Sequence, residues 1–413
     1  MKRMLCIASA AVALIGMCGT GEAKSLEEIL REKGVITEED YKEAVKNNDM
    51  AFYKPGKGIT VETRDGKFSA NVGGRMQVLY TYTDFDDSAE DDSSSFSIKR
   101  MKVWLQGNAF LKDLTYRFQY DFKSENLEDA YIAYKFAEPF KLAGGQMKPA
   151  QARQELNSSA KSLFVDRSLA NDTFNVGRDL GVQASGNFAD HLVEYIVGGF
   201  NGNGPNENNV GDDHMFAIRI DVNPLGPVSK DESSFGNEDL LLNIGGSFIS
   251  STFTDGDVGN VSGDNDVYDV AFNIDGNFAS SAAFNAEFGS ELEWDLYTAN
   301  LHARWRGATF GAEYYLLDAS PDEGGDFDAD GYYIQGGYMI LPDTLELAVR
   351  YSAIESDDDD APEQFDEQQY QFGVNYYLAK HNAKLQADYT HVNDDENDDA
   401  DDNIVRLQAQ LIF

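Results

Sequence analysis

The chain has 413 residues, with 72 Asp and Glu against 33 Lys and Arg and a formal charge of −39. So acidic a protein repels nucleic-acid phosphates, which excludes DNA or RNA as a partner. Its 21 Tyr and 26 Phe are too many aromatic residues for a disordered acidic chain. No uncharged apolar run reaches the ~20 residues that a membrane-spanning helix needs, so a large soluble β protein and a membrane β-barrel remain.

The first residues read as a secretory signal peptide, predicted over residues 1–23. An apolar stretch over 5–17 follows a basic start, and small residues lead to Ala23, as a signal peptidase requires. Cys6 and Cys18 both lie in this segment, so the exported chain has no cysteine. This favours a bacterial periplasmic or outer-membrane protein over a disulfide-bonded secreted domain.

Residues 24–57 are predicted to form a periplasmic helical segment. Apolar residues from Leu26 to Leu30 recur at helical spacing, and Thr37 with Asp40 is placed to cap a second helix. Two helices of about ten residues cannot bury a core of their own. Two interpretations stay open: a coil that self-associates, and a loosely ordered linker.

From about residue 67 the hydrophobic pattern changes to a period of two. Every second residue from Leu114 to Phe122 is apolar, whereas the residues between them, such as Arg117 and Asp121, are polar. The same alternation recurs at 216–222 and in later stretches. A soluble sandwich also alternates, so this pattern alone does not decide the architecture.

The lengths of the connections favour a membrane barrel. Very short links, such as 111–113 and 341–343, alternate with long polar links, such as 148–178 and 393–402, with few exceptions. Outer-membrane barrels have short periplasmic turns and long outer loops, and a sandwich has no reason to keep that order. A last strand ending in Phe413 is also typical of such barrels.

The predicted fold is therefore an all-β, transmembrane, antiparallel up-and-down β-barrel over residues 58–413 with acidic extracellular loops. The strands give a count of 18, and omitting the hairpin around 279–290 gives the alternative of 16. The strands are predicted over 67–83, 95–110, 114–124, 127–136, 140–148, 178–189, 191–200, 213–223, 238–252, 266–279, 281–290, 296–306, 308–318, 331–341, 344–354, 368–379, 382–393 and 403–413.

Charge is distributed unevenly between the loops and the predicted lumen. Five long links, over 84–95, 253–266, 318–331, 355–367 and 393–402, are rich in Asp and Glu and contain no Lys or Arg. They either keep the surface solvated or bind divalent cations that bridge to lipopolysaccharide.

The inward face of the strands is mixed and mildly basic, which suits a water-filled channel in so wide a barrel. The predicted pore-lining residues are Arg75, Arg100, Lys102, Arg117, Asp121, Arg219, Arg304, Arg306, Arg350, Lys384 and Arg406.

The longest link, 148–178, is less acidic than the others and contains the apolar run 163–165, which needs a partner surface. We expect it to fold into the lumen and narrow it, with an outer lid as the alternative. Its basic residues at the expected constriction are Lys148, Arg153, Lys161 and Arg167.

Several stretches resemble the phosphate-selective porin O and P family. They are GGRMQ (73–77), SIKRMK (97–102), DAYIAY (129–134), GQMKP (145–149) and FVDR (164–167), in that family's order. The resemblance implies a homotrimeric outer-membrane channel of about 16 strands with a periplasmic coil before the barrel. The family's name also implies selectivity for phosphate.

We therefore predict an outer-membrane porin for passive diffusion of small ions and solutes, with anions such as phosphate passing a mildly basic lumen. The alternative is a structural or adhesive barrel whose acidic loops bind divalent cations or a partner. No catalytic, cofactor or metal site is predicted, because no His lies in a Gly-x-Ser-x-Gly or His-Glu-x-x-His context. The expected partners are outer-membrane lipid, lipopolysaccharide and further copies of the chain.

Overall fold

The computed structural model describes residues 26–41, 51–85, 92–209, 211–236, 238–254, 257, 284–285, 288–356, 365–394 and 402–413. The predicted signal peptide, 1–23, lies outside these ranges. The chain divides into two compact units, residues 1–51 and 52–413. Within the described ranges, no helix is both long enough and apolar enough to cross a membrane.

The N-terminal unit contains helix α2 (Leu26–Glu32) and one helical turn over 38–41. Asp40 N donates to Thr37 Oγ1 at 3.0 Å, while Asp40 Oδ2 accepts from Thr37 N at 3.0 Å and from its hydroxyl at 2.6 Å. These hydrogen bonds lower the pKa of Asp40. The capping predicted for a second helix is therefore present.

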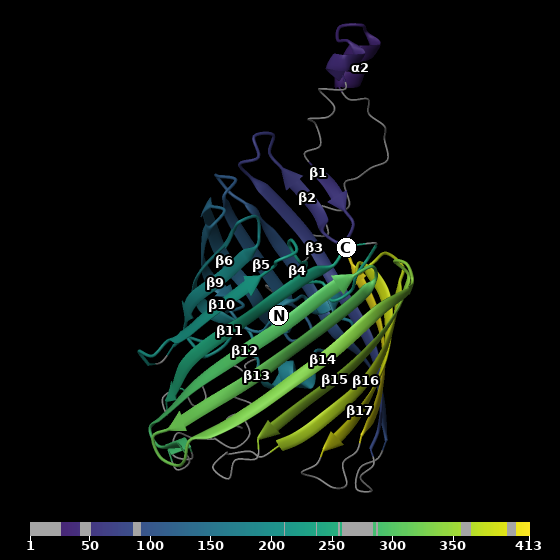
Figure 1. Cartoon of the computed structure of the whole chain (residues 1–413). Coiled ribbons are helices and arrows are strands. Elements are labelled where there is room, and N and C mark those ends of the chain that lie inside the picture. The colour runs from purple at the N-terminus through teal and green to yellow at the C-terminus, as the bar shows by residue number, and fades with distance from the viewer. Residues whose placement is uncertain are drawn as a thin grey trace, which may run out of the picture. The chain divides into compact units, whose positions relative to one another are not determined.

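The second unit is a closed antiparallel barrel of 16 strands, β3 to β18, with β1 and β2 outside the ring (Figure 1). Each strand pairs with the next, and β18 pairs with β3 over Arg75–Asp84, which closes the ring. The outside strands are β1 (Ala51–Lys54) and β2 (Gly58–Glu62), and β2 pairs with the first residues of β3. The barrel strands are β3 (Ser69–Asp84), β4 (Ser93–Asn108), β5 (Leu114–Asp121), β6 (Asn126–Ala137), β7 (Phe140–Met147), β8 (Asp179–Phe188), β9 (Val193–Phe200), β10 (Met215–Val222), β11 (Leu241–Thr254), β12 (Glu291–Trp305), β13 (Ala308–Pro321), β14 (Phe327–Leu341), β15 (Leu345–Ser356), β16 (Phe365–Tyr377), β17 (Ala383–Asp394) and β18 (Asn403–Ile412).

The predicted fold class is confirmed with the alternative count of 16, and the count of 18 is wrong. β11 pairs directly with β12 along its whole length, so both edges of each strand are occupied and no further hairpin fits between them. The expected strand 266–279 lies outside the described residues. Within the expected strand 281–290, residues 284–285 and 288 are helical and 289–290 form a turn.

The two faces of the barrel wall differ as a membrane barrel requires. On β5, Phe118 faces outward with 43% of its surface exposed, whereas Asp121 faces inward with 4% exposed. Apolar residues are likewise exposed on the outer faces of strands around the ring, among them Phe216, Ile244, Leu301, Phe310, Ile334, Val349, Phe372, Leu385 and Leu407. This belt is the surface that contacts lipid.

The polarity of the two faces reverses toward the outer end of β12. Outward-facing residues are apolar from Tyr297 onward and acidic at Asp295, whereas inward-facing residues are polar from Thr298 onward and apolar at Trp294 and Leu296. β13 and β14 show the same reversal. The long strands therefore extend beyond the lipid and enclose a dry, apolar interior there.

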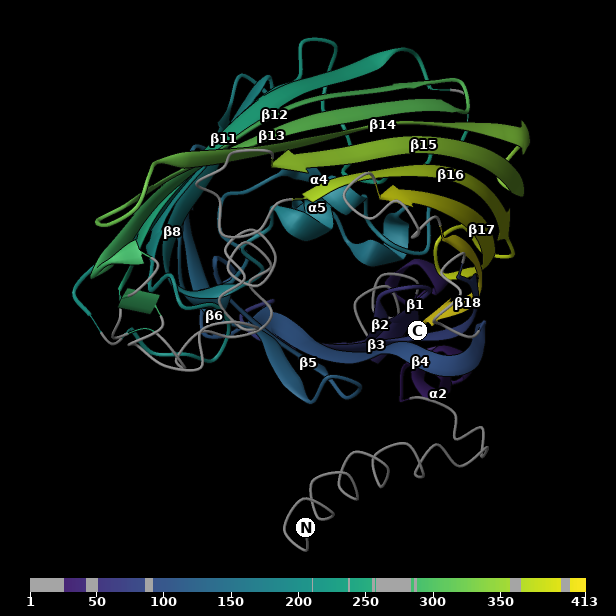
Figure 2. The same cartoon turned by 90° about the horizontal axis from the view of Figure 1, so that it is seen from below.

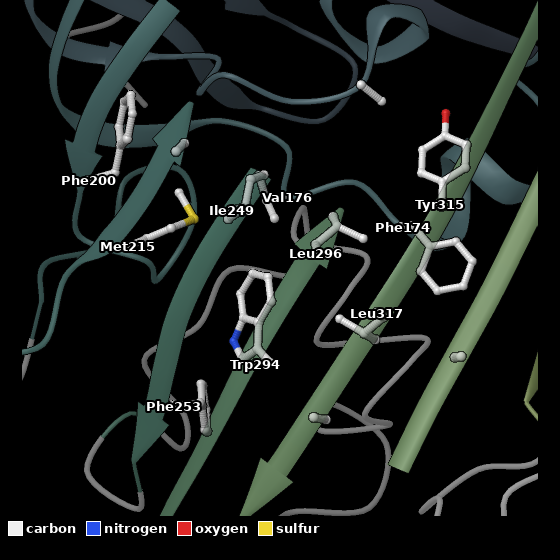
Figure 3. Close-up of a cluster of buried hydrophobic side chains, with 14 of the residues drawn as sticks. Phe174, Val176, Phe200, Met215, Ile249, Phe253, Trp294, Leu296, Tyr315 and Leu317 are labelled. Atoms are coloured by element: carbon white, nitrogen blue, oxygen red, sulfur yellow. The ribbon is translucent and has the colours of Figure 1, made fainter. Parts of the chain in front are cut away.

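The link 148–178, called the inner segment below, lies inside the ring of strands, where α4 and α5 are visible in Figure 2. It contains α4 (Arg153–Leu156), the 3-10 helix η1 (Ser159–Lys161) and α5 (Leu169–Thr173). Phe174 and Val176 pack in one buried cluster with Trp294, Leu296 and Leu317 of the wall (Figure 3). The segment is thus folded into the barrel, and the outer-lid alternative is wrong.

Candidate functional site

A cavity of about 950 Å³ remains between the inner segment and the wall made by β3 to β9. Basic side chains outnumber acidic ones around it. The basic residues that line it are Lys57, Arg75, Lys99, Arg100, Lys102, Arg117, Lys141, Lys148, Lys161, Arg167, Arg178 and Lys230. The acidic ones are Asp121, Glu128, Asp129, Glu155 and Asp172. The cavity is therefore far more basic than the lumen face as a whole.

A β-bulge in β4 concentrates this charge. Arg100 pairs with Gln77 and Ile98 with Val78, so Lys99 is the extra residue between them. The bulge lets Lys99 line the cavity together with Arg100 and Lys102, whereas strict alternation would point it outward. Sequence reasoning missed Lys99 for this reason. The visible signal is the spacing of three between the outward-facing Ile98 and Met101.

A second bulge acts in the same way on β6. Gln119 pairs with Asp129 and Tyr120 with Leu127, so Glu128 is the extra residue and lines the cavity beside Asp129. Glu128 was also missed from the sequence. The same spacing of three, from Leu127 to Ala130, marks it.

Four of the five acidic residues of the cavity are neutralised by ion pairs. Lys102 contacts Glu128 and lies 3.6 Å from Asp121. Arg117 and Arg178 contact Asp129 at 2.7 Å and 2.8 Å. Glu155 of the inner segment pairs with Lys148 at 2.5 Å and with Arg167 at 2.8 Å.

Arg75 and Arg100 differ from these residues because, among the described residues, no carboxylate lies within ion-pair distance of either. Arg75 Nη1 donates to Ser158 Oγ at 3.5 Å and Arg100 Nη1 to Gln77 Oε1 at 3.2 Å. Arg75 Nε is buried without a hydrogen-bond partner in the described part of the chain. These two guanidinium groups therefore leave positive charge free to act on a solute.

The structure divides the predicted site residues into two groups and leaves one apart. The cavity brings together Arg75, Arg100, Lys102, Arg117, Asp121, Lys148, Lys161 and Arg167. The other group does not line it, and consists of Arg153, Arg219, Arg304, Arg350, Lys384 and Arg406. Five of these six belong to the wall and one, Arg153, to the inner segment. Arg350 Nη2 donates to Arg167 O at 2.7 Å, and Lys384 Nζ to Ser162 O at 3.1 Å.

Four anchoring residues of the wall, Arg219, Arg350, Lys384 and Arg406, do not line the cavity because the inner segment lies against them. Arg304 instead donates to Ser233 O in the link between β10 and β11. Arg153, expected at the constriction, belongs to the inner segment and donates to Asn243 of the wall and to Ser229 O. Buried main-chain carbonyls of a lumen segment need donors, and long cationic side chains of the wall supply them. Arg306 does not line the cavity for another reason. It follows the last residue of β12, has a φ of 47°, and lies exposed with its guanidinium 5.8 Å from the Trp305 ring centroid.

A model of the family described as phosphate-selective porin O and P matches residues 70–413. The chain belongs to this porin family. Porin O of Pseudomonas aeruginosa is 24% identical over 72% of this chain and 70% of its own. An uncharacterized protein of Aquifex aeolicus is 23% identical over the full length of both chains.

Solved structures of similar fold include an anion-selective porin from Comamonas acidovorans, with a TM-score of 0.55 and 12% identity over 83% of this porin and 99% of that chain. The outer-membrane channel DcaP of Acinetobacter baumannii has a TM-score of 0.54 and 14% identity over 83% and 97%. At such identities these likenesses concern the fold. Family and fold together make this porin a channel of the bacterial outer membrane, and the adhesive alternative is not favoured.

Asp172 should make the selectivity of this porin depend on pH. Asp172 is exposed to the cavity, but its position deep inside the barrel, together with the nearby carboxylate of Asp166, raises its pKa to about 6. Its negative charge is therefore present at neutral pH and lost as the pH falls through about 6. Burial lowers the pKa of Lys148 to about 7, so this lysine gains positive charge over the same range.

Both changes make the cavity more positive, so the preference for chloride over potassium should rise between about pH 7.5 and about pH 5. Asp172→Asn should show a higher preference at pH 7.5 and a smaller rise on acidification. Reversal potentials at the two pH values measure both, with Asp190→Asn, an exposed turn residue, as the control. An unchanged response in Asp172→Asn would contradict this role.

Proposed function

We propose that this porin conducts small anions by passive diffusion and that the basic cavity is its selective region. The observation that carries the proposal is the free charge of Arg75 and Arg100 beside carboxylates that are already paired. A positive, confined lumen raises the local concentration of anions and repels cations. The acidic outer loops oppose entry, but salt screens charges over roughly 8–10 Å and limits their reach.

Phosphate is the proposed preferred anion, because a guanidinium group donates two parallel hydrogen bonds to two oxygens of one oxyanion, and the single atom of chloride has no such pair of acceptors. The test is a planar-bilayer recording in KCl to which inorganic phosphate is added. Phosphate should block the chloride current of the wild type and block Arg75→Lys/Arg100→Lys less, since lysine keeps the charge and loses the paired donors. If phosphate leaves the wild-type chloride current unchanged, selectivity for phosphate is refuted and general anion conduction remains.

We further propose that the protein is a homotrimer that buries the wall of short strands. β5, β7, β9 and β10 each have 8 residues, against 14 or 15 for β11 to β14. An 8-residue strand tilted by about 40° spans about 20 Å, less than the apolar band of about 25 Å. Other copies would shield this wall from lipid.

The N-terminal segment, 24–57, is proposed to self-associate in the periplasm after removal of the signal peptide, 1–23. Support comes from the length of α2, which has 7 residues. So short a helix is unstable in water unless it packs against a partner. A mass measurement of the detergent-solubilised protein should give three copies, and a monomer would refute the trimer.

Lipopolysaccharide is the proposed lipid partner at the outer rim. Asp318 lies directly opposite Asp295 on one side and Asp328 on the other, all on the outer face where the strands leave the lipid. Like charges in register repel, and divalent cations shared with lipid phosphates would neutralise them. Chelation with EDTA should release copurified lipopolysaccharide from the wild type more than from Asp318→Asn.

A further inference from the structure

The link between β10 and β11 differs from the other connections at its end of the barrel. The turns after β4, β12 and β14 have two to five residues, whereas this link begins after Val222 and reaches Leu241. It turns into the barrel. Glu232, Ser233 and Ser234 are buried, with at most 5% of their surface exposed. A periplasmic connection therefore meets the inner segment inside the lumen.

Glu232 makes the contacts with the inner segment. One carboxylate oxygen accepts a hydrogen bond from Leu163 N at 2.8 Å, and the other accepts from Gln154 Nε2 at 3.2 Å. Its own main-chain N donates to Lys161 O at 3.2 Å. Next to it, Asp231 pairs with Lys161 Nζ at 2.5 Å. The side chain of Glu232 thus bonds both to Gln154 in α4 and to Leu163 just after η1.

Ser233 fastens the link to the wall. Its hydroxyl donates to Glu346 Oε2 at 2.9 Å on β15 and lies 2.8 Å from the Tyr377 hydroxyl on β16. Its carbonyl accepts from Arg304 Nη2 of β12 at 2.8 Å. Two consecutive residues therefore hold the inner segment and the barrel wall together.

We propose that this link is a latch that fixes the inner segment from the periplasmic side, with Glu232 as its positioning residue. The stretch of the segment between Gln154 and Leu163 supplies Asn157, Ser158 and Lys161 to the cavity. Any movement of the segment therefore changes the width and charge of the conduction path. The inference rests on the proposed channel function and adds a residue that acts through the segment without lining the cavity.

The test is to release the latch and record single channels. Glu232→Ala removes two acceptors and leaves Leu163 N without its partner, so the population of displaced segment should rise about tenfold. We expect larger open-channel current noise and closure at lower voltage, with a reversal potential close to that of the wild type. Glu232→Gln keeps one acceptor and the side-chain shape. Its current noise should therefore lie between that of the wild type and that of Glu232→Ala.

Glu238→Gln is the matched control, because Glu238 belongs to the same link and pairs with Arg304 of the wall at 3.3 Å, not with the segment. The double variant Lys161→Cys/Glu232→Cys places thiols on two residues joined by a main-chain hydrogen bond. Reduced, it should be noisy, and oxidised, its current noise should fall to that of Lys161→Cys alone, which accounts for the cavity charge that the variant loses.

Wild-type noise in folded Glu232→Ala, or equal effects of Glu232→Ala and Glu238→Gln, would overturn the latch. Failure of the wild type to conduct at all would instead refute the channel function. The two failures are therefore distinguishable, and heat-dependent migration on a gel verifies that each variant has folded.

Discussion

Replacing Arg75 and Arg100 by glutamate together is expected to turn an anion-preferring channel into a cation-preferring one. The double variant changes the cavity by four charge units at two guanidinium groups that have no carboxylate partner among the described residues. Each unit charge alters the energy of an ion at about 8 Å by about 0.5 kcal/mol in water. After screening by salt, the ratio of chloride to potassium permeability should fall at least about tenfold.

The reversal potential in a KCl gradient measures this change. The matched control is Lys54→Glu/Arg306→Glu, which makes the same change in charge at two exposed positions that do not line the cavity. If the control shifts the reversal potential as much as Arg75→Glu/Arg100→Glu does, the selectivity belongs to the overall field of the protein. The cavity would then lose its assigned role.

Removing the inner segment is expected to raise the single-channel conductance several-fold and to weaken selectivity. Met147 and Asp179 are directly paired at its two ends, so a short Gly-Asn-Gly turn can replace residues 150–176 without straining β7 or β8. The lumen would then be limited by the wall alone, as in a wide porin. The deletion also uncovers Trp294 and Leu317, so the variant should unfold at a lower temperature.

Because the deletion variant risks misfolding, Phe174→Ala is the milder companion. Phe174 is buried against Tyr315, with ring centroids 5.9 Å apart, and its loss should cost about 3–5 kcal/mol of packing. It should loosen the segment and increase current noise in a folded barrel. A folded deletion variant with wild-type conductance would show that the segment does not limit the current.

The sequence was sufficient to predict the barrel because alternation and link lengths are local properties. It was insufficient for the number of strands. Residues 266–279 alternate as a strand does, but the pairing of β11 with β12 is a long-range fact that no local pattern reports. Segments on either side of an insertion can pair as if it were absent, provided that its ends are close together.

The site was predictable to the extent that strict alternation holds. Arg117 and Asp121 follow it and line the cavity. Lys99 and Glu128 do not, because a bulge shifts the phase by one residue. A spacing of three between outward apolar residues was the available signal, and it becomes convincing only when the pairing strand is known.

The anchoring role of Arg350 and Lys384 was beyond prediction for another reason. A cation on the inner face meets either water or a folded segment, and the sequence does not say which carbonyls will reach it. The apolar run 163–165 did indicate that the inner segment needs a surface. Its partners stayed hidden because Leu163 and Phe164 pack on Ala348 and under the guanidinium of Arg350, neither of which looks like an apolar surface in the sequence.

The most direct measurement is a single-channel recording of the wild-type protein in a planar bilayer across a KCl gradient. A barrel with a water-filled lumen and a basic cavity should give ohmic current steps. Its reversal potential should have the sign expected of a channel that prefers chloride. Absence of steps would mean that the lumen is closed. A reversal potential of the sign expected for potassium would mean that Arg75 and Arg100 do not govern passage.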